Sequence, residues 1–178
     1  MMKGVAMELR DAWSIACKDL RIELRSRILT NQIAPYTLLI VVLFGFALDA
    51  DTQTLRDTGP GLFWVAVLLI ALLAIQRAVK IEDDDAARER MLLTPVHSSS
   101  VFLGKAIALF IQLVALEILL FFVMLALFDL SVEDPLLICL SAILATIGVA
   151  SSGTLYGVIA AGVGVRETLL PILLLPVL

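Results

Sequence analysis

The sequence offers too little polar surface for a soluble protein of 178 residues. Hydrophobic residues make up 61% of the chain, and its mean hydropathy is +1.03. Soluble domains are roughly 45–50% apolar by comparison. A soluble fold is therefore excluded, and we predict an integral membrane protein.

Residues that carry redox, metal or haem chemistry are also scarce. The two cysteines, Cys17 and Cys139, fall near opposite membrane faces on the topology argued below, so we expect free thiols and no disulfide. His97 is the only histidine. Because a metal site needs several converging donors, we interpret His97 as a solvated loop residue. The C-x-x-C-H pattern of haem attachment is absent as well.

A phosphate-binding loop is missing too. The letters "LGK" at 103–105 match its end, but the motif needs a glycine five residues before the second glycine and Ser or Thr after the lysine. Serine and Ala106 occupy those positions, so we expect no ATP binding by this chain. The charged N-terminal segment does not look like a removable signal peptide either.

Long apolar runs are what the chain has in abundance. A helix needs about 20 mostly apolar residues to cross a hydrocarbon core of about 30 Å. Four segments reach that length once their flanks are counted: residues 30–48, 60–79, 102–128 and 136–164. A fifth run, 168–178, covers only about half of the membrane, so we expect it to be an incomplete span.

The basic residues alternate along the chain and predict its orientation. Residues 1–32 hold six of the 13 lysines and arginines, the loop after the first span one, residues 77–105 five, and the next turn none. The remaining one, Arg166, follows the fourth span. Because cytoplasmic loops are enriched in Lys and Arg, we expect the N-terminus and the 80–100 loop in the cytoplasm.

Residues 7–29 are too polar to cross a membrane, yet they have a helical apolar stripe. The stripe consists of Leu9, Trp13, Ala16, Leu20 and Leu24. A basic amphipathic helix beside a span most simply lies along the inner membrane surface. The alternative is a cytoplasmic helix that packs on a partner.

The 80–100 loop holds a dense acidic cluster followed by three apolar residues and a proline. Asp83, Asp84 and Asp85 favour the start of a short helix, and Pro95 ends it. A simple solvated connector would not need Met91, Leu92 and Leu93. We predict a cytoplasmic coupling helix that docks on a soluble partner. These three residues would be its anchors, and Glu82, Asp85 and Glu89 its charged contacts.

Glu117 lies near the middle of the third apolar span. An ionised carboxylate at that depth is unfavourable by several kcal/mol and usually faces protein or water. Glu117 is either part of a conformational switch or a protonated residue that hydrogen-bonds a neighbouring helix. Gly153 and Gly157 in the fourth span form a small-xxx-small pattern. Helix packing is their expected role, and lining a cavity is the weaker alternative.

Four stretches of the chain resemble the heme exporter protein B (CcmB) family. They are "KDLRIELRSR" (18–27), "RMLLTPVHSSSVFLGK" (90–105), "LVALEILL" (113–120) and "GTLYGVIAAGVGVRETLLPILLLP" (153–176). The order and spacing resemble the family over almost the whole chain, and the last block is the most specific. The "EDDDAARER" stretch is more acidic than the usual family version.

The resemblance implies a fold like that of ABC-2 exporters: an all-α membrane bundle with an N-terminal elbow helix and six spans, of which about four and a half are present. It implies a non-enzymatic inner-membrane subunit of an ATP-driven cytochrome c maturation complex. The implied partners are a CcmA-like ATPase that binds the ATP, CcmC-like and CcmD-like membrane subunits, and the CcmE-like haem chaperone. Haem would be handled by the complex, with no cofactor bound by this chain itself.

Two other functions stay open on the residues alone. The chain is alternatively a generic ABC-2 permease subunit for another substrate, or a membrane scaffold that assembles partners and transports nothing. The neighbouring genes would distinguish a generic permease from a cytochrome c maturation subunit. A reconstituted transport assay would distinguish a transporter from a scaffold.

Overall fold

The computed structural model describes residues 2–27, 29–48, 52–82, 97–128 and 134–163. These residues form helices and contain no strand. In chain order the elements are α1 (Met2–Ser26), the π-helical turn η1 (Leu29–Ile33), α2 (Ala34–Ala47), α3 (Thr52–Glu82), α5 (Ser98–Phe128) and α6 (Pro135–Val163). For the described residues, the expectation of an all-helical protein is confirmed.

Three helices are long and apolar enough to cross a membrane: Gln53–Ala78 within α3, Ser98–Phe128 and Pro135–Gly157. A fourth candidate is a bent pair, Met7–Ser26 with Asn31–Ala47, whose two parts meet at 54°. The second part contains α2, which alone has 14 residues and spans about 21 Å at 1.5 Å per residue. The chain is therefore a membrane protein, and the described residues contain three or four candidate spans.

The helix α3 begins well before the predicted span 60–79, at Thr52. Pro60 lies inside it, where the ring removes one backbone N–H from the helical ladder. The added turns are mostly polar and exposed, although Leu55 is buried. The Thr58 hydroxyl donates a hydrogen bond to the Thr54 carbonyl at 2.6 Å. Hydropathy identifies the apolar part of a helix and not the polar turns that extend it, which explains the difference.

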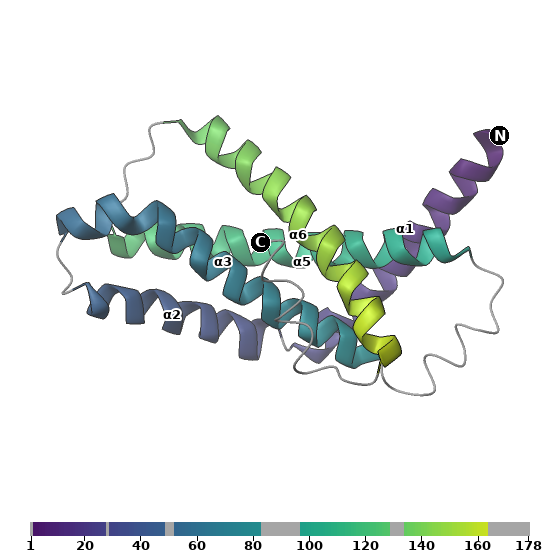
Figure 1. The fold of residues 1–178 in the computed structure, drawn as a ribbon, viewed down its shortest axis with the longest axis horizontal. Helices are drawn as coiled ribbons and strands as arrows, with labels where there is room; N and C mark the ends of the chain where they lie inside the picture. The colour runs from purple at the N-terminus through teal and green to yellow at the C-terminus, as the bar shows by residue number, and fades with distance from the viewer. Residues whose placement is uncertain (1, 28, 49–51, 83–96, 129–133, 164–178) are drawn as a thin grey trace.

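The helices α2, α3 and α5 run alongside one another, and α6 leans across α3 and α5 (Figure 1). The starts of α2 and α5 and the ends of α3 and α6 lie toward the same end of the bundle (Figure 1). There α1 crosses the first part of α5, and this is the most extensive helix–helix contact among the described residues. The end of α3 and the start of α5 thus lie at the end of the bundle where α1 crosses α5.

Two apolar clusters hold the bundle together. The first lies between α2, α3 and α5 and includes Val41, Ile70, Leu120, Met124 and Phe128. The second lies between α3, α5 and α6 and includes Ala71, Ala74, Ile75, Leu109, Leu113, Val149 and Ala150. Small residues in the second cluster let these helices approach closely, as is usual where lipid supplies no hydrophobic drive for packing.

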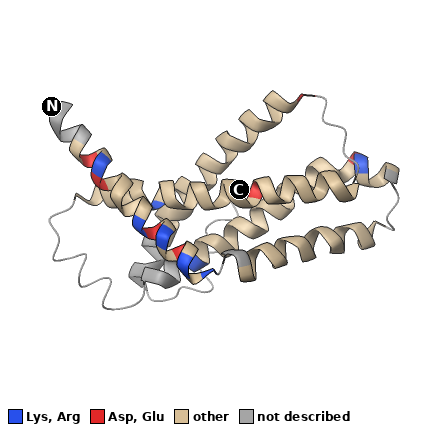
Figure 2. Cartoon of the chain, turned by 180° about the vertical axis from the view of Figure 1, so that it is seen from behind, with Lys and Arg blue, Asp and Glu red and all other residues tan. Residues whose placement is uncertain are grey.

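The buried face of α1 coincides only in part with its predicted apolar stripe, with which it shares Ala16. Ala12 and Ala16 are fully buried, whereas Leu9, Trp13 and Leu24 are 56%, 56% and 79% exposed. Figure 2 shows that charged residues gather along α1, whereas the α2 and α6 sequences contain none. The helix therefore has a buried face that includes Ala12, Ala16 and Glu23, an exposed apolar face and a charged face.

Candidate functional site

Glu117 lies in the interior of α5 and is 9% exposed. The Thr146 hydroxyl of α6 donates a hydrogen bond to Glu117 Oε1 at 2.6 Å. The residues beside Glu117 that face the core are the buried Leu113, Leu116 and Leu120. The pair is therefore a polar link between two spans within an otherwise apolar environment, where an unpartnered carboxyl group would be unfavourable.

The Thr146 hydroxyl has a second acceptor, the carbonyl of Ala142 at 2.7 Å. A hydroxyl group has one proton, so it donates fully to only one of these two oxygens. Both contacts are complete when Glu117 carries a proton and donates to the hydroxyl oxygen, while the hydroxyl donates to Ala142. The geometry thus fits a neutral, hydrogen-bonded Glu117, which was one of the two interpretations of the sequence.

A hollow of about 390 Å³ lies between α3 and α6 beside this pair. Its lining consists of Trp64, Val67, Leu68, Ala145, Thr146, Gly148, Val149 and Ser152. Thr146 therefore links the buried carboxyl of Glu117 to the surface of the hollow. The Ser152 hydroxyl donates to the Gly148 carbonyl at 2.7 Å. Because both lining hydroxyls already bond within α6, the hollow suits apolar material better than a polar ligand.

The two predicted packing glycines lie on the inner side of α6. A Cβ at Gly153 would collide with Ile75 Cδ1 of α3 and come within 2.8 Å of Ile75 Cγ1, so a larger residue here requires the Ile75 side chain to move. Gly157 is buried one turn later. Both positions therefore face protein, with Gly153 directly at the α3–α6 contact.

A second close contact, which the sequence analysis missed, lies between α5 and α1. A Cβ at Gly104 would come within 2.7 Å of the Ala12 carbonyl oxygen and 2.8 Å of Ile15 Cβ. The sequence signal for this contact was a single glycine near the start of a long apolar helix. That glycine belongs to the letters "LGK", which were considered above only as the end of a phosphate-binding loop. Thr146 was missed as well, because a threonine in an apolar span does not show which helix it faces.

Most of the predicted coupling helix lies outside the described residues. Glu82 is the last residue of α3. Asp83, Asp84, Asp85, Glu89, Met91, Leu92, Leu93 and Pro95 belong to the part that the structure does not describe. His97 is exposed just before α5, where its carbonyl accepts the backbone N–H of Ser100 at 3.0 Å. Within the described ranges, no group of three or more His, Cys, Asp or Glu residues could hold a metal ion.

Comparison with known proteins shows which family this arrangement belongs to. Heme exporter protein B of Escherichia coli K12 is 30% identical over 96 residues, which is 54% of this chain and 44% of that protein. The proteins of the same name from Pseudomonas aeruginosa and Haemophilus influenzae are 31% and 33% identical over 70 and 73 residues. These matches cover 39% and 41% of this chain, and 31% and 33% of those relatives.

The matched stretch thus spans less than half the length of these curated relatives. No solved structure matches the chain. The profile of the CcmB protein family matches residues 10–178, which is nearly the whole sequence. The chain therefore belongs to the CcmB family.

Proposed function

We propose that the chain is the transmembrane subunit of an ATP-driven complex for cytochrome c maturation, linked to haem delivery or to release of a haem-loaded chaperone. The family match over residues 10–178 carries this proposal, because the curated relatives are named for haem export. Because of the same match, a generic permease for another substrate is the less favoured of the two candidate functions. The helical bundle supports a membrane subunit and contributes no evidence about the cargo.

The proposal includes an inner-membrane location with the N-terminus in the cytoplasm. Its support is the alternation of basic residues together with the fold: α1, with four exposed cations, crosses the end of the bundle where α5 begins. In this arrangement α1 corresponds to the elbow helix of an ABC-2-like fold with six spans. Cysteines placed at 53–58 should react with an impermeant thiol reagent in whole cells, whereas one at 97 should not.

ATP hydrolysis belongs to a separate CcmA-like subunit, with CcmC-like, CcmD-like and CcmE-like proteins as further partners. The support is chemical, because the sequence has no phosphate-binding loop. The ATPase would dock on residues 82–95. This segment connects α3 to α5, and both helices pack against each other, against α6 and, through α5, against α1. A push on the segment therefore acts directly on the two helices at the centre of the bundle.

Two double variants test the docking assignment. Buried anchors dominate interface energies, while rim charges contribute less and depend on salt. Leu92→Ala with Leu93→Ala should therefore weaken co-purification of the ATPase by about tenfold or more, and Asp83→Ala with Asp84→Ala should weaken it less. Both should reach wild-type levels in the membrane, since neither alters an apolar span. Full ATPase capture by the Leu92/Leu93 variant would overturn the assignment.

Deletion of the gene in its own host tests the function itself. Covalently bound haem in c-type cytochromes should disappear from membrane fractions, while b-type haem proteins persist. Restoring the full-length gene should restore the c-type signal. Unchanged c-type cytochromes after deletion would refute the role in maturation and favour a generic permease. Loss of maturation in a variant that still assembles all partners would argue against a pure scaffold.

A further inference from the structure

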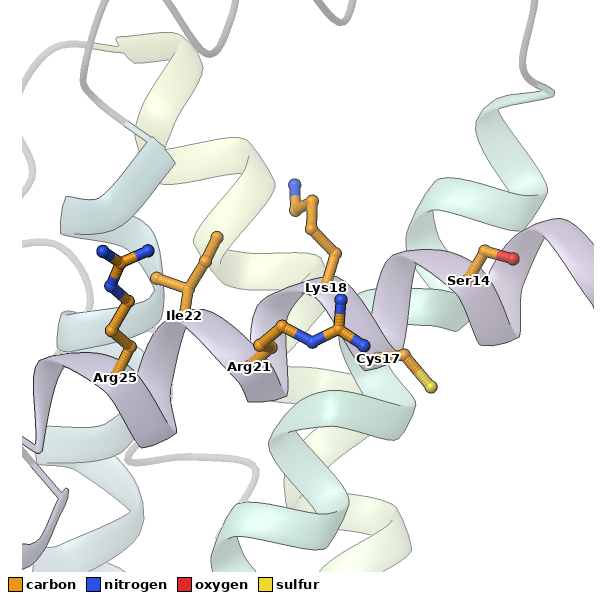
Figure 3. A pocket seen from close by; sticks show the side chains of 6 residues that line it. All are labelled: Ser14, Cys17, Lys18, Arg21, Ile22 and Arg25. Carbon is orange, nitrogen blue, oxygen red and sulfur yellow. The ribbon is translucent and has the colours of Figure 1, made fainter.

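The outer side of α1 carries a hollow that neither the family assignment nor the proposed function uses. It has a volume of about 420 Å³, and the described residues around it are Ser14, Cys17, Lys18, Arg21, Ile22 and Arg25. Figure 3 shows Lys18, Ile22 and Arg25 rising from the same side of the helix, while Arg21 lies along it toward Cys17. Three cationic side chains therefore surround one small space.

Within the described part of the chain, two of the three cations of this hollow have no ion-pair partner. Among the described residues, Lys18 pairs with Asp19 at 3.2 Å, and this is the only ion pair that involves the hollow. Arg21 and Arg25 are exposed and have no such pair with a described residue. A guanidinium group offers a planar fork of donors that matches phosphate, and it is weakly hydrated. The hollow therefore suits an anion with phosphate geometry.

The position of α1 places this hollow at the membrane boundary. The contact between α1 and α5 is at Gly104. The apolar residues that follow, 106–128, are long enough to fill a hydrocarbon core of about 30 Å by themselves, at about 1.5 Å per residue. Gly104 therefore lies where the core ends, and α1 crosses α5 at the level of the lipid headgroups.

The face of α1 beside the hollow is apolar and exposed. Leu9, Trp13 and Leu24 are each more than half exposed, and in helical projection they lie between the buried alanines and the cations. Trp is enriched at membrane interfaces, and clusters of Lys and Arg there attract anionic lipids. A water-soluble anion would need only the cations, whereas a lipid uses the cations and the apolar face together.

We infer that the hollow formed by Lys18, Arg21 and Arg25 binds the phosphate of an anionic phospholipid, whose acyl chains lie along the apolar face of α1. The lipid would hold α1 flat on the bilayer, while Ala12 and Ala16 hold it on α5. This inference does not depend on the proposed function, because it needs only the structure of α1 and its depth in the membrane.

The test measures which lipids the full chain retains. The purified protein is equilibrated in detergent with equal amounts of phosphatidylglycerol and phosphatidylcholine of the same acyl chains, separated again, and its bound lipids are quantified by mass spectrometry. Wild-type protein should retain phosphatidylglycerol preferentially. Each cation near an anionic headgroup contributes about a fivefold preference, so Arg21→Gln with Arg25→Gln should lower the preference by at least about tenfold.

A matched control removes two charges elsewhere on the same segment. Arg10 and Arg27 are both exposed and do not line the hollow. Arg10→Gln with Arg27→Gln should therefore keep most of the preference, and Arg21→Lys with Arg25→Lys should keep part of it. Equal loss in the control would overturn a discrete site in favour of general charge attraction.

The wild-type protein alone also decides the question, so a variant that fails to fold leaves the test intact. No preference between the two lipids would overturn the inference, whatever the variants do. Inorganic phosphate at matched ionic strength should leave the lipid preference largely unchanged. If phosphate removes it completely, the site is one for free phosphate and the lipid assignment is wrong.

Discussion

At two glycines, Gly104 and Gly153, an added Cβ would clash with a neighbouring helix, and the surroundings of the two differ. At Gly104 an added Cβ would meet the Ala12 carbonyl oxygen and Ile15 Cβ, both close to the backbone of α1. At Gly153 it would meet the far end of the Ile75 side chain of α3. A side-chain end moves by changing rotamer, whereas a carbonyl moves only if its whole helix moves.

The comparison indicates that the bundle has one rigid joint and one adjustable joint. The α1–α5 contact at Gly104 fixes α1 to the first turns of α5. The α3–α6 contact at Gly153 can give way locally. Under the proposed docking of an ATPase on residues 82–95, motion that reaches the start of α5 would carry α1 and α5 together, while α6 can slide on α3.

The largest expected effect is that of Gly104→Ala. Overpacking typically destabilises by about 1–3 kcal/mol and occasionally by more, and here the obstacle is backbone, so we expect the upper end of that range. The variant should lose its monodisperse peak at a clearly lower temperature when the detergent-purified chain is heated and analysed by size exclusion.

Gly61→Ala is the control, since a Cβ there meets nothing within 4 Å. Alanine favours a helix by about 1 kcal/mol over glycine, so this control should be neutral or slightly stabilising. A Gly104→Ala variant as stable as the wild type would show that α1 is not held at this point.

The coarse fold could be predicted from sequence because a bilayer imposes it. Backbone groups in hydrocarbon must bond within their own helix, so long apolar runs can only be helices. The rotation of each helix could not be predicted in the same way. In α2, Leu39, Leu43 and Phe46 are exposed while Thr37 is fully buried, because lipid accepts apolar side chains as readily as the protein core does.

The second effect, of intermediate size, is that of Gly153→Ala. Ile75 must change its position, so we expect a destabilisation of about 1 kcal/mol in the same thermal assay. Ile75→Val removes the Cδ1 atom that the new methyl group would meet, and the double variant keeps the total volume constant. The double variant should therefore recover much of the loss.

Gly148→Ala on the same helix serves as the control, because its Cβ would also meet nothing within 4 Å. A double variant no better than Gly153→Ala would mean that the obstacle is not Ile75 but the α3 backbone. The α3–α6 joint would then be as rigid as the one at Gly104, and the contrast between the two would fail.

The candidate site was predictable only in part, for a related reason. An ionisable residue in an apolar span indicates a partner, and Glu117 has one. That this partner is Thr146 depends on how α6 is rotated and how far it is shifted along α5. The residues around Thr146 in the sequence determine neither quantity. The coupling segment differs from Thr146 in both respects. Its composition is conspicuous in the sequence, but most of it, residues 83–96, lies outside the described structure.

The smallest expected effect is at the Glu117–Thr146 pair. Interhelical hydrogen bonds in membranes contribute about 0.6 kcal/mol on average and about 1.7 kcal/mol at most. Glu117→Leu and Thr146→Val should each destabilise by an amount in that range, and the two together by less than the sum, because either one removes the bond. Glu117→Gln should stay near wild type, since its amide N–H can donate to the Thr146 oxygen as the protonated carboxyl group does. Its c-type cytochrome production in the host should also be unchanged, because the structure shows Glu117 engaged in helix packing. A Glu117→Gln variant with wild-type stability and partner assembly but without cytochrome production would instead identify Glu117 as a switch, since only the ability to ionise has been removed.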